Sequence, residues 1–446
     1  MGALSSSPSM SGALTNPRSS SSPVRPRLRE WGFRVILVAL SLLVVLGTLE
    51  IAARILRTQQ QGGKEGREDA RYKEYDPLLG WRKKKNANTT YRRREYTVDV
   101  QINSQGLRDP ERSLEPPAGT FRVLALGDSF VEGYTVDLKQ TVTQRLESRL
   151  NETGCSAEVI NGGTSAYSTD QEYLFYLSDG ARYRPSLVLL FFFWNDVIYS
   201  DRQDYFGTPK PVFEMGGGDL RLHRYPVKEK PAEATLNQEE AQDAPEGSAL
   251  LAMVRERLWV GAPLAHDTLA RLGLWNPIPQ ATPRLEMLVY DQRDLAPVED
   301  AWEKVGVILK ALKKDVEGHG SKLAIVYVPG RMEIQESSWK ATQQMYRLRD
   351  GAWDLTKVRR KVEGFGASLQ IPVVDVGPAL QVAERPFRPT YFTFDGHWNA
   401  RGHEVASGAV FDWMKGAGAL PLKCGGTLPL EAMSAVVQAP PAGPSP

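Results

Sequence analysis

Apolar residues run almost without interruption through one early stretch of the chain. The run extends from Trp31 to Ala53, with Arg34 and Glu50 near its two ends. It reaches the ~20 residues that a helix needs to cross a bilayer. The pattern predicts a transmembrane helix over residues 31–54.

A cleaved signal peptide is the competing interpretation, because an apolar run of this length fits one too. The pairs Ile51/Ala53 and Glu50/Ala52 are poor small-x-small cleavage sites, so we favour an uncleaved signal anchor. Residues 1–30 are a basic arm rich in Ser, Pro and Gly, a composition that predicts disorder. Its arginines favour an N-terminus on the inner side. The rest of the chain is then expected on the exported side of the inner or cell membrane, either periplasmic or extracellular.

Strand and helix patterns alternate from residue 119 onward. Strands are expected at 121–126, 157–160, 186–193, 322–328 and 371–376, and helical stripes at 298–317 and 400–415. The third strand is apolar throughout, as expected for a strand covered on both faces. This alternation predicts an α/β fold, a flavodoxin-like parallel sheet of about five strands covered by helices on both faces.

Three segments lack this alternation of strands and helices. Residues 55–118 are a polar, basic juxtamembrane segment, which ends in a half-buried β extension where Tyr96, Val98, Val100 and Ile102 alternate with polar residues. Residues 199–297 interrupt the domain predicted over 119–418, as a lid over the site or a surface excursion. Residues 419–446 are rich in proline towards their end and predict a flexible tail.

Composition narrows the class of protein further. A formal charge of +2 argues against a nucleic-acid binder, so we expect no nucleic-acid partner. Cys155 and Cys424 form one bridge in an exported protein or remain two separate thiols, and the sequence does not choose between them. No histidine or cysteine has a partner at metal-ligand spacing, so we expect neither a metal nor another cofactor. The oligomeric state is left open.

Polar residues follow the predicted strands at their carboxyl ends, where ligands bind in an open α/β sheet. Gly127-Asp128-Ser129 follows the first strand, and the loop Asn161-Gly-Gly-Thr-Ser-Ala166 follows the second. Trp194-Asn195-Asp196 follows the third strand, and Asp395-Gly-His397 lies beyond the fifth. A hydroxyl, a turn with free N–H groups, an amide and an Asp-x-His pair are therefore expected at one sheet edge. These are the groups that acyl transfer needs.

The same four segments, in this order, resemble the SGNH/GDSL hydrolase superfamily of serine esterases and acyltransferases. The resemblance covers about residues 95–416, with a lead-in Ile-Asn-Ser-Gln-Gly-Leu-Arg-Asp at 102–109 that is similar to membrane-anchored members. It implies that Ser129 is the nucleophile and His397 the general base. It also implies that Asp395 orients the imidazole, and that the Ser129 N–H and the Asn195 amide donate to the oxyanion.

Two positions depart from the family pattern. Ala166 stands where the family has a glycine as backbone oxyanion donor, and Gly163 is the alternative donor. The family's aspartate lies three residues before the histidine, whereas Asp395 lies only two before it. A turn brings the Asp395 carboxylate to the imidazole, or a backbone carbonyl orients His397 and the pair works as a dyad. Three further residues near these motifs are interpreted as structural. We expect His403 to be a packed histidine, and Asp128 and Asp196 to cap turns.

Three functions agree with these residues. The first is a membrane-anchored serine esterase that cleaves acyl esters, with acetyl favoured, through an acyl-enzyme. The second is an O-acyltransferase with the same triad, which passes the acyl group to an envelope polysaccharide instead of water. The third is a non-catalytic glycan-binding or scaffold protein on a decayed site, suggested by Ala166 and the short Asp-His spacing. The expected partners are an acylated small molecule, glycan or lipid as substrate, and the membrane through the N-terminal helix.

Overall fold

A computed structural model describes residues 25–60, 71–93, 95–216, 219–229, 247–275 and 285–421. Most of the predicted arm at 1–30 and tail at 419–446 lies outside these residues, as does most of the acidic part of the insertion. The chain divides into two compact units, residues 1–56 and 57–446.

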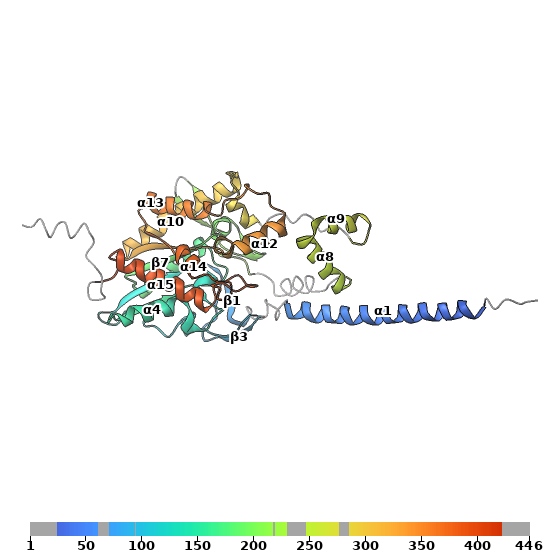
Figure 1. The fold of residues 1–446 in the computed structure, drawn as a ribbon. Coiled ribbons are helices and arrows are strands. Elements are labelled where there is room, and N and C mark those ends of the chain that lie inside the picture. The colour runs from blue at the N-terminus through green and yellow to red at the C-terminus, as the bar shows by residue number, and fades with distance from the viewer. Residues whose placement is uncertain are drawn as a thin grey trace, which may run out of the picture. The chain divides into compact units, whose positions relative to one another are not determined.

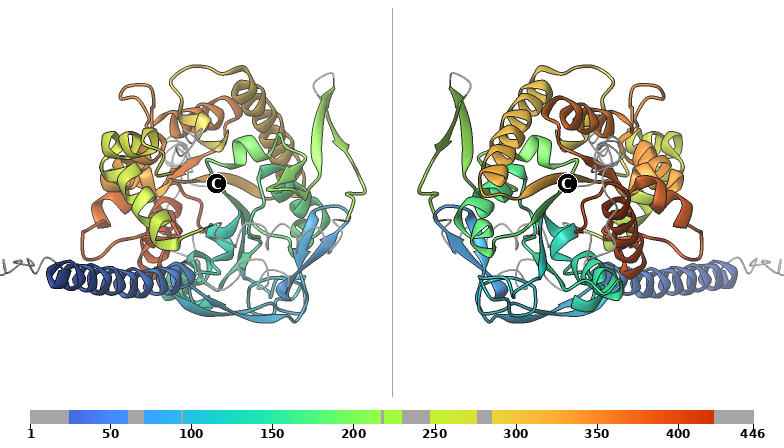
Figure 2. Two further views of the ribbon diagram at one scale, coloured as in Figure 1. Left: turned by 90° about the vertical axis from the view of Figure 1, so that its right-hand side faces the viewer. Right: turned by 90° about the vertical axis from the view of Figure 1, so that its left-hand side faces the viewer.

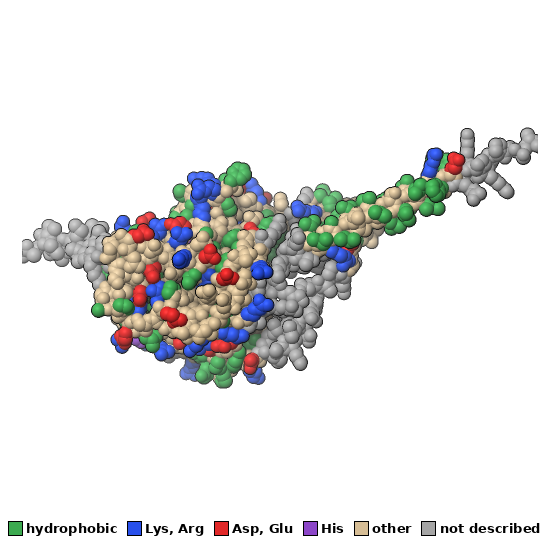
Figure 3. Space-filling model, turned by 90° about the horizontal axis from the view of Figure 1, so that it is seen from below, with side chains coloured by type: hydrophobic (Ala, Val, Ile, Leu, Met, Phe, Trp, Pro, Cys, Tyr) green, Lys and Arg blue, Asp and Glu red, His purple; other side chains and the backbone are tan. Residues whose placement is uncertain are grey.

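The first unit contains all but the last four residues of the long helix α1 (Arg25–Gln60) (Figure 1). Its stretch Glu30–Leu56 is long and apolar enough to cross a membrane, and the most apolar part of this stretch is not buried. Hydrophobic side chains project all along it (Figure 3). A transmembrane anchor and a signal sequence both have this composition, so the helix agrees with either interpretation.

The second unit is built on a five-stranded parallel sheet. The strands are β5 (Phe121–Leu126), β6 (Ala157–Asn161), β7 (Leu187–Phe193), β12 (Lys322–Val328) and β13 (Val373–Asp375). Their order is β13-β12-β7-β5-β6, so that β5, the first of the five along the chain, lies between the second (β6) and the third (β7). This is the flavodoxin-like order, so the predicted fold class is confirmed.

Helices cover both faces of this sheet (Figure 2). One face packs against α5 (Thr169–Ser178), α10 (Ala296–Gly318) and α13 (Lys357–Leu369). The other packs against α4 (Val142–Glu152), α14 (Gly377–Ala383) and α15 (Ala400–Gly416). Successive strand residues alternate between these two cores, as the two-residue period of a strand requires. Both cores are apolar and both contain side chains of β7, so every residue of this strand is hydrophobic.

The segment that precedes the sheet forms two antiparallel hairpins. The strands β1 (Lys73–Asp76) and β2 (Gly80–Lys83) pair with each other, as do β3 (Asn88–Arg92) and β4 (Thr97–Gln101). In β4 Val98 and Val100 are buried while their neighbours are exposed, as the alternation predicts. Tyrosines from this segment and Phe392 of the α/β domain share a small core with β4.

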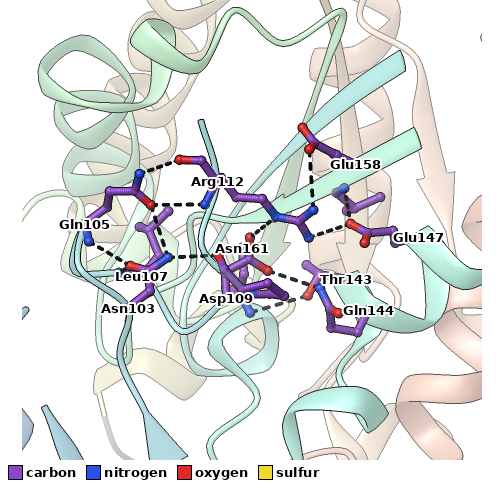
Figure 4. Close-up of polar contacts among 12 residues, drawn as sticks. Asn103, Gln105, Leu107, Asp109, Arg112, Thr143, Gln144, Glu147, Glu158 and Asn161 are labelled. Atoms are coloured by element: carbon purple, nitrogen blue, oxygen red, sulfur yellow. Dashed lines mark hydrogen bonds and ion pairs between the residues drawn. The ribbon is translucent and has the colours of Figure 1, made fainter. Parts of the chain in front are cut away.

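The lead-in motif at 102–109 attaches this segment to the domain. Arg108 is fully buried and donates hydrogen bonds to the carbonyls of Glu132, Gly133 and Val136 at 2.6–3.0 Å. Asp109 accepts from Arg112 at 2.9 Å and from Gln144 of α4 at 3.1 Å (Figure 4). The motif therefore has a structural function in this chain. It packs against α4 and against the turn that follows the predicted nucleophile.

The insertion between β7 and β12 contains more strand than its sequence suggests. It holds the short pair β8 (Asp204–Tyr205) and β9 (Thr208–Pro209), and the hairpin β10 (Val212–Gly216) and β11 (Asp219–His223). Two helices follow, α8 (Ala249–Gly261) and α9 (Pro263–Arg271), then the 3₁₀ turn η3 (Leu285–Tyr290). The remaining short helices are α3 (Ser129–Glu132), η1 (Leu138–Gln140), η2 (Gly180–Tyr183), α6 (Asp196–Tyr199), α11 (Arg331–Ile334) and α12 (Glu336–Tyr346).

Candidate active site

Ser129 is the first residue of α3 and directly follows the tight turn after β5. β5 is buried along its whole length, and Asp128 caps α3 by accepting a hydrogen bond from the Phe130 N–H at 2.9 Å. Gly127 permits the turn, because a Cβ atom there would lie 2.4 Å from Cγ2 of Val131. The turn therefore fixes Ser129 as the first residue of α3, beyond the carboxyl end of the sheet. The predicted capping function of Asp128 is confirmed.

Ser129, His397 and Asp395 form a continuous hydrogen-bonded chain. The Ser129 hydroxyl oxygen lies 2.8 Å from Nε2 of His397, and Nδ1 of His397 lies 2.5 Å from Oδ1 of Asp395. Gly396 makes the short Asp-x-His spacing possible, because it adopts φ +84°, which favours glycine. The structure therefore realises the first alternative for this motif, in which a turn brings the carboxylate to the imidazole.

The charges of this pair are set by their mutual contact. Burial raises the pKa of Asp395, but the attraction and hydrogen bonds of His397, with the Tyr96 hydroxyl, outweigh it and lower that pKa to about 2. Burial lowers the pKa of His397, yet the Asp395 carboxylate raises it above its ordinary value of 6.5. Asp395 is thus ionised at neutral pH, and an imidazolium formed beside it is stabilised.

Two of the predicted oxyanion donors line the same pocket as Ser129. Ala166 adopts φ +70°, a conformation normally taken by glycine, at the position where the family has a glycine. Asn195 lies two residues beyond the end of β7, and its side chain also borders the pocket. The N–H of the alternative donor, Gly163, is donated to Oδ1 of Asn161 at 3.1 Å. This geometry favours Ala166 over Gly163.

The pocket over Ser129 has a volume of about 280 Å³. Residues from the juxtamembrane segment, the domain and the insertion line it: Lys73, Tyr91, Arg93, Asp128, Ser129, Tyr134, Ser165, Ala166, Phe193, Asn195, Tyr205 and His397. The sequence motifs did not indicate the contributions of Lys73, Tyr91 and Arg93, which precede the α/β domain. Tyr205 is the contribution of the predicted insertion.

The other polar residues near the motifs have structural functions. His403 is buried, and its Nδ1 accepts a hydrogen bond from the Val142 N–H at 3.1 Å, while burial lowers its pKa to about 3. Asp196 accepts from the Phe193 N–H at 3.1 Å, which closes the turn after β7. These contacts confirm the structural interpretations of both residues. In the described part of the chain, no three His, Cys, Asp or Glu residues are grouped to hold a metal ion.

Comparison with known proteins bears on the class of this domain. One part of the domain is similar to a known family of SGNH hydrolase-like domains. Residues 286–425 match a family model described as "SGNH hydrolase-like domain, acetyltransferase AlgX". The match includes the Asp-Gly-His motif and does not extend to the Gly-Asp-Ser turn. No curated protein matches the chain.

Solved structures of an acylhydrolase and an esterase are among the structural matches. The lipase/acylhydrolase from Enterococcus faecalis has a TM-score of 0.33 at 11% identity, covering 66% of this chain and 96% of its own. TesA has a TM-score of 0.33 at 11% identity, and the match covers 66% of this chain and 98% of TesA. The acetyl xylan esterase AlAXEase has a TM-score of 0.32 at 10% identity, and the match covers 66% of this chain and 98% of the esterase.

Proposed function

We propose that the chain is a membrane-anchored serine esterase that cleaves acyl esters through an acyl-enzyme. One observation carries this proposal, the unbroken chain of hydrogen bonds from Ser129 through His397 to Asp395 at the wall of a pocket. A nucleophile, its base and an orienting carboxylate in hydrogen-bond contact are the components of covalent acyl catalysis. This intact chain favours catalysis over the scaffold interpretation.

The proposed reaction has two half-reactions. His397 takes the hydroxyl proton while the Ser129 oxygen bonds to the acyl carbon, and the resulting oxyanion accepts hydrogen bonds from the Ser129 N–H, the Ala166 N–H and the Asn195 amide. The C–O bond to the alcohol then breaks, and His397 returns the proton to the leaving alcohol. In the second half, His397 deprotonates water as the water oxygen bonds to the acyl carbon. The bond from that carbon to the Ser129 oxygen then breaks, His397 returns the proton to the serine, and the carboxylic acid leaves.

Transfer to a hydroxyl acceptor is the second candidate function. It uses the same steps, except that a sugar hydroxyl replaces water in the second half. The family model matched at residues 286–425 names an acetyltransferase, which favours this candidate. The tyrosine faces of Tyr91, Tyr134 and Tyr205 at the pocket suit a glycan or a lipid ester as substrate.

We further propose that α1 remains attached as an anchor and that the second unit is exported. Cys155 is disulfide-bonded, and disulfides persist in oxidising compartments outside the cytosol. Export therefore agrees with the chemistry of this cysteine. The acylated substrate would then be a component or a ligand of the cell envelope.

The test uses the full-length protein in detergent micelles. Hydrolysis of p-nitrophenyl acetate is measured for the wild type and for Ser129→Ala, together with labelling by a fluorophosphonate probe. We expect turnover and labelling that both disappear in Ser129→Ala. Oligosaccharide acceptors are then added to the active enzyme, and acylated products distinguish transfer from hydrolysis. A wild type that neither turns over ester nor takes the probe would overturn the catalytic proposal and favour the scaffold interpretation.

A further inference from the structure

The second carboxylate oxygen of Asp395 has its own hydrogen-bond donor. The Tyr96 hydroxyl donates to Oδ2 of Asp395 at 2.7 Å, while Oδ1 faces His397. Tyr96 immediately precedes β4, in the segment between the membrane helix and the α/β domain. The two oxygens of Asp395 therefore contact partners from distant parts of the chain. One lies in the same turn, and the other lies almost three hundred residues earlier.

The residue next to Tyr96 holds the backbone of the same turn. The Glu95 carboxylate accepts hydrogen bonds from three successive N–H groups, those of Thr393 (2.6 Å), Phe394 (2.8 Å) and Asp395 (3.1 Å). Successive backbone N–H groups that point to one place form a concave anion site. Here the anion is a side chain of the chain itself. It fixes the backbone at the point where Asp395 begins its short turn to His397.

The opposite side of this turn is held from within the domain. Arg331 of α11 donates to the carbonyl oxygens of Phe392 and Thr393. The ring of Phe392 packs against the ring of Tyr96 with centroids 5.0 Å apart. The turn at 392–395 thus lies between a carboxylate that holds its N–H groups and a guanidinium that holds its carbonyls.

We infer that Glu95 and Tyr96 are positioning residues for the proposed triad. This inference rests on the proposed function. Gly396 gives the Asp-Gly-His turn more backbone freedom than any other residue would, so the turn alone does not fix the direction of the carboxylate. The Tyr96 hydroxyl selects the orientation in which Oδ1 faces Nδ1, and Glu95 fixes the backbone from which it extends. The juxtamembrane segment thereby completes the catalytic geometry of a domain that follows it in sequence.

The packing of Tyr96 separates this function from a purely structural one. Tyr96→Phe keeps the ring that packs against Phe392 and removes only the hydroxyl. A loss of packing lowers the amount of folded protein, whereas a misdirected carboxylate lowers the rate of each folded molecule. The two functions are therefore distinguished by kcat per active site that reacts with the probe. KM is measured beside it to separate a change in rate from a change in substrate binding.

The experiment compares full-length variants in detergent micelles. Tyr96→Phe and Glu95→Gln are assayed with p-nitrophenyl acetate for kcat and KM, and the rate of fluorophosphonate labelling of Ser129 is measured. Tyr173→Phe is the matched control for the first, because the Tyr173 hydroxyl donates to Asp315 at 2.6 Å and does not line the pocket. Glu111→Gln is the control for the second, because the Glu111 carboxylate accepts from the Ser104 N–H at 2.8 Å.

We expect kcat and the labelling rate to fall about 10-fold in Tyr96→Phe and in Glu95→Gln, with KM within about two-fold of the wild type. The two control variants should keep wild-type rates. If the wild type is active, Ser129→Ala is inactive and Tyr96→Phe labels at the wild-type rate, the positioning inference is wrong while the proposed function stands. If the wild type does not react at all, both fail together.

Discussion

At the scale of single residues, Asp395 and His397 of the proposed triad have very different pKa values. Asp395 has a pKa of about 2, so its charge is constant over the physiological range. The pKa of His397 lies above 6.5. Of these two groups, only the histidine therefore changes its charge near neutral pH, and its titration should produce an acid limb in the pH-rate profile.

The first prediction is the direction of this pH dependence. His397 accepts the serine proton only when neutral, so kcat/KM should fall as pH decreases through its raised pKa. We expect the midpoint of this limb above the ordinary value of 6.5. The measurement is kcat/KM for p-nitrophenyl acetate from about pH 5 to about pH 9, with the Ser129→Ala rate subtracted. A rate that stays constant well below pH 6.5 would contradict the assignment of His397 as the base.

The second prediction concerns the Asn195 amide. Its Oδ1 is buried and accepts no hydrogen bond from the described residues. We assign its amide N–H to the developing oxyanion. Asn195→Ala should therefore lower kcat by about 10²–10³-fold and leave KM nearly unchanged, as expected for a donor used mainly in the transition state. The readout is steady-state kinetics with p-nitrophenyl acetate.

Ala166→Gly is the matched control at the other oxyanion position. The assigned donor at residue 166 is the backbone N–H, and glycine keeps it while adopting φ +70° without strain. This variant should keep kcat within about three-fold of the wild type. Equal, small effects in Asn195→Ala and Ala166→Gly would show that the asparagine side chain does not stabilise the oxyanion.

At the scale of elements, the lead-in motif holds the turn that follows α3. Arg108 donates to three carbonyls at that turn, and all three hydrogen bonds are buried. We predict that Arg108→Met lowers the free energy of unfolding by about 2–4 kcal/mol, because it leaves these carbonyls without their donor. Urea unfolding followed by tryptophan fluorescence measures this change.

An exposed arginine provides the comparison for this stability measurement. Arg184 is paired with Glu115 at 2.6 Å, and both side chains are about two-thirds exposed. Arg184→Met should therefore change the free energy of unfolding by less than about 0.5 kcal/mol. If both variants lose the same small amount, the Arg108 network does not stabilise the domain as its burial implies.

The sequence predicted those elements whose pattern is local. The apolar run 186–193 and the helical stripe at 298–317 correspond to β7 (Leu187–Phe193) and α10 (Ala296–Gly318). The hairpin of β10 and β11 was not predicted. Gly216 ends β10 and Asp219 begins β11, and the pairing depends on contacts between the two strands rather than on a periodic pattern.

The same distinction applies to the site. Ser129 and Asn195 were predicted because each lies in a motif just beyond a strand, and His397 was predicted from its Asp-x-His motif. Glu95 and Tyr96 were not, because a glutamate and a tyrosine in a basic segment carry no motif. Their importance comes only from the tertiary contact with residues 393–395. Positioning residues of this kind are found from the fold rather than from the sequence.

At the scale of the whole molecule, the segment that follows α1 belongs to the proposed site. Lys83 is buried and donates to Oγ1 of Thr164 at 2.7 Å, and the Trp81 indole donates to the Ser165 carbonyl at 3.1 Å. These contacts hold the loop that carries Ala166, while Tyr96 contacts Asp395. One N-terminal segment therefore braces both the oxyanion loop and the histidine loop. The α/β domain alone lacks these supports.

The last prediction is that α1 stays on the mature protein. An uncleaved anchor keeps Trp31–Ala53 in the bilayer, because transferring this apolar stretch into water is strongly unfavourable. The native full-length protein should then remain in the membrane pellet after an alkaline carbonate wash and be released by detergent. Intact-mass spectrometry of the released protein should include the residues before Trp31. A mature N-terminus beyond Ala53, with the protein in the soluble fraction, would instead identify α1 as a cleaved signal sequence. The proposed site would then function without an anchor, since none of its lining residues lies in α1.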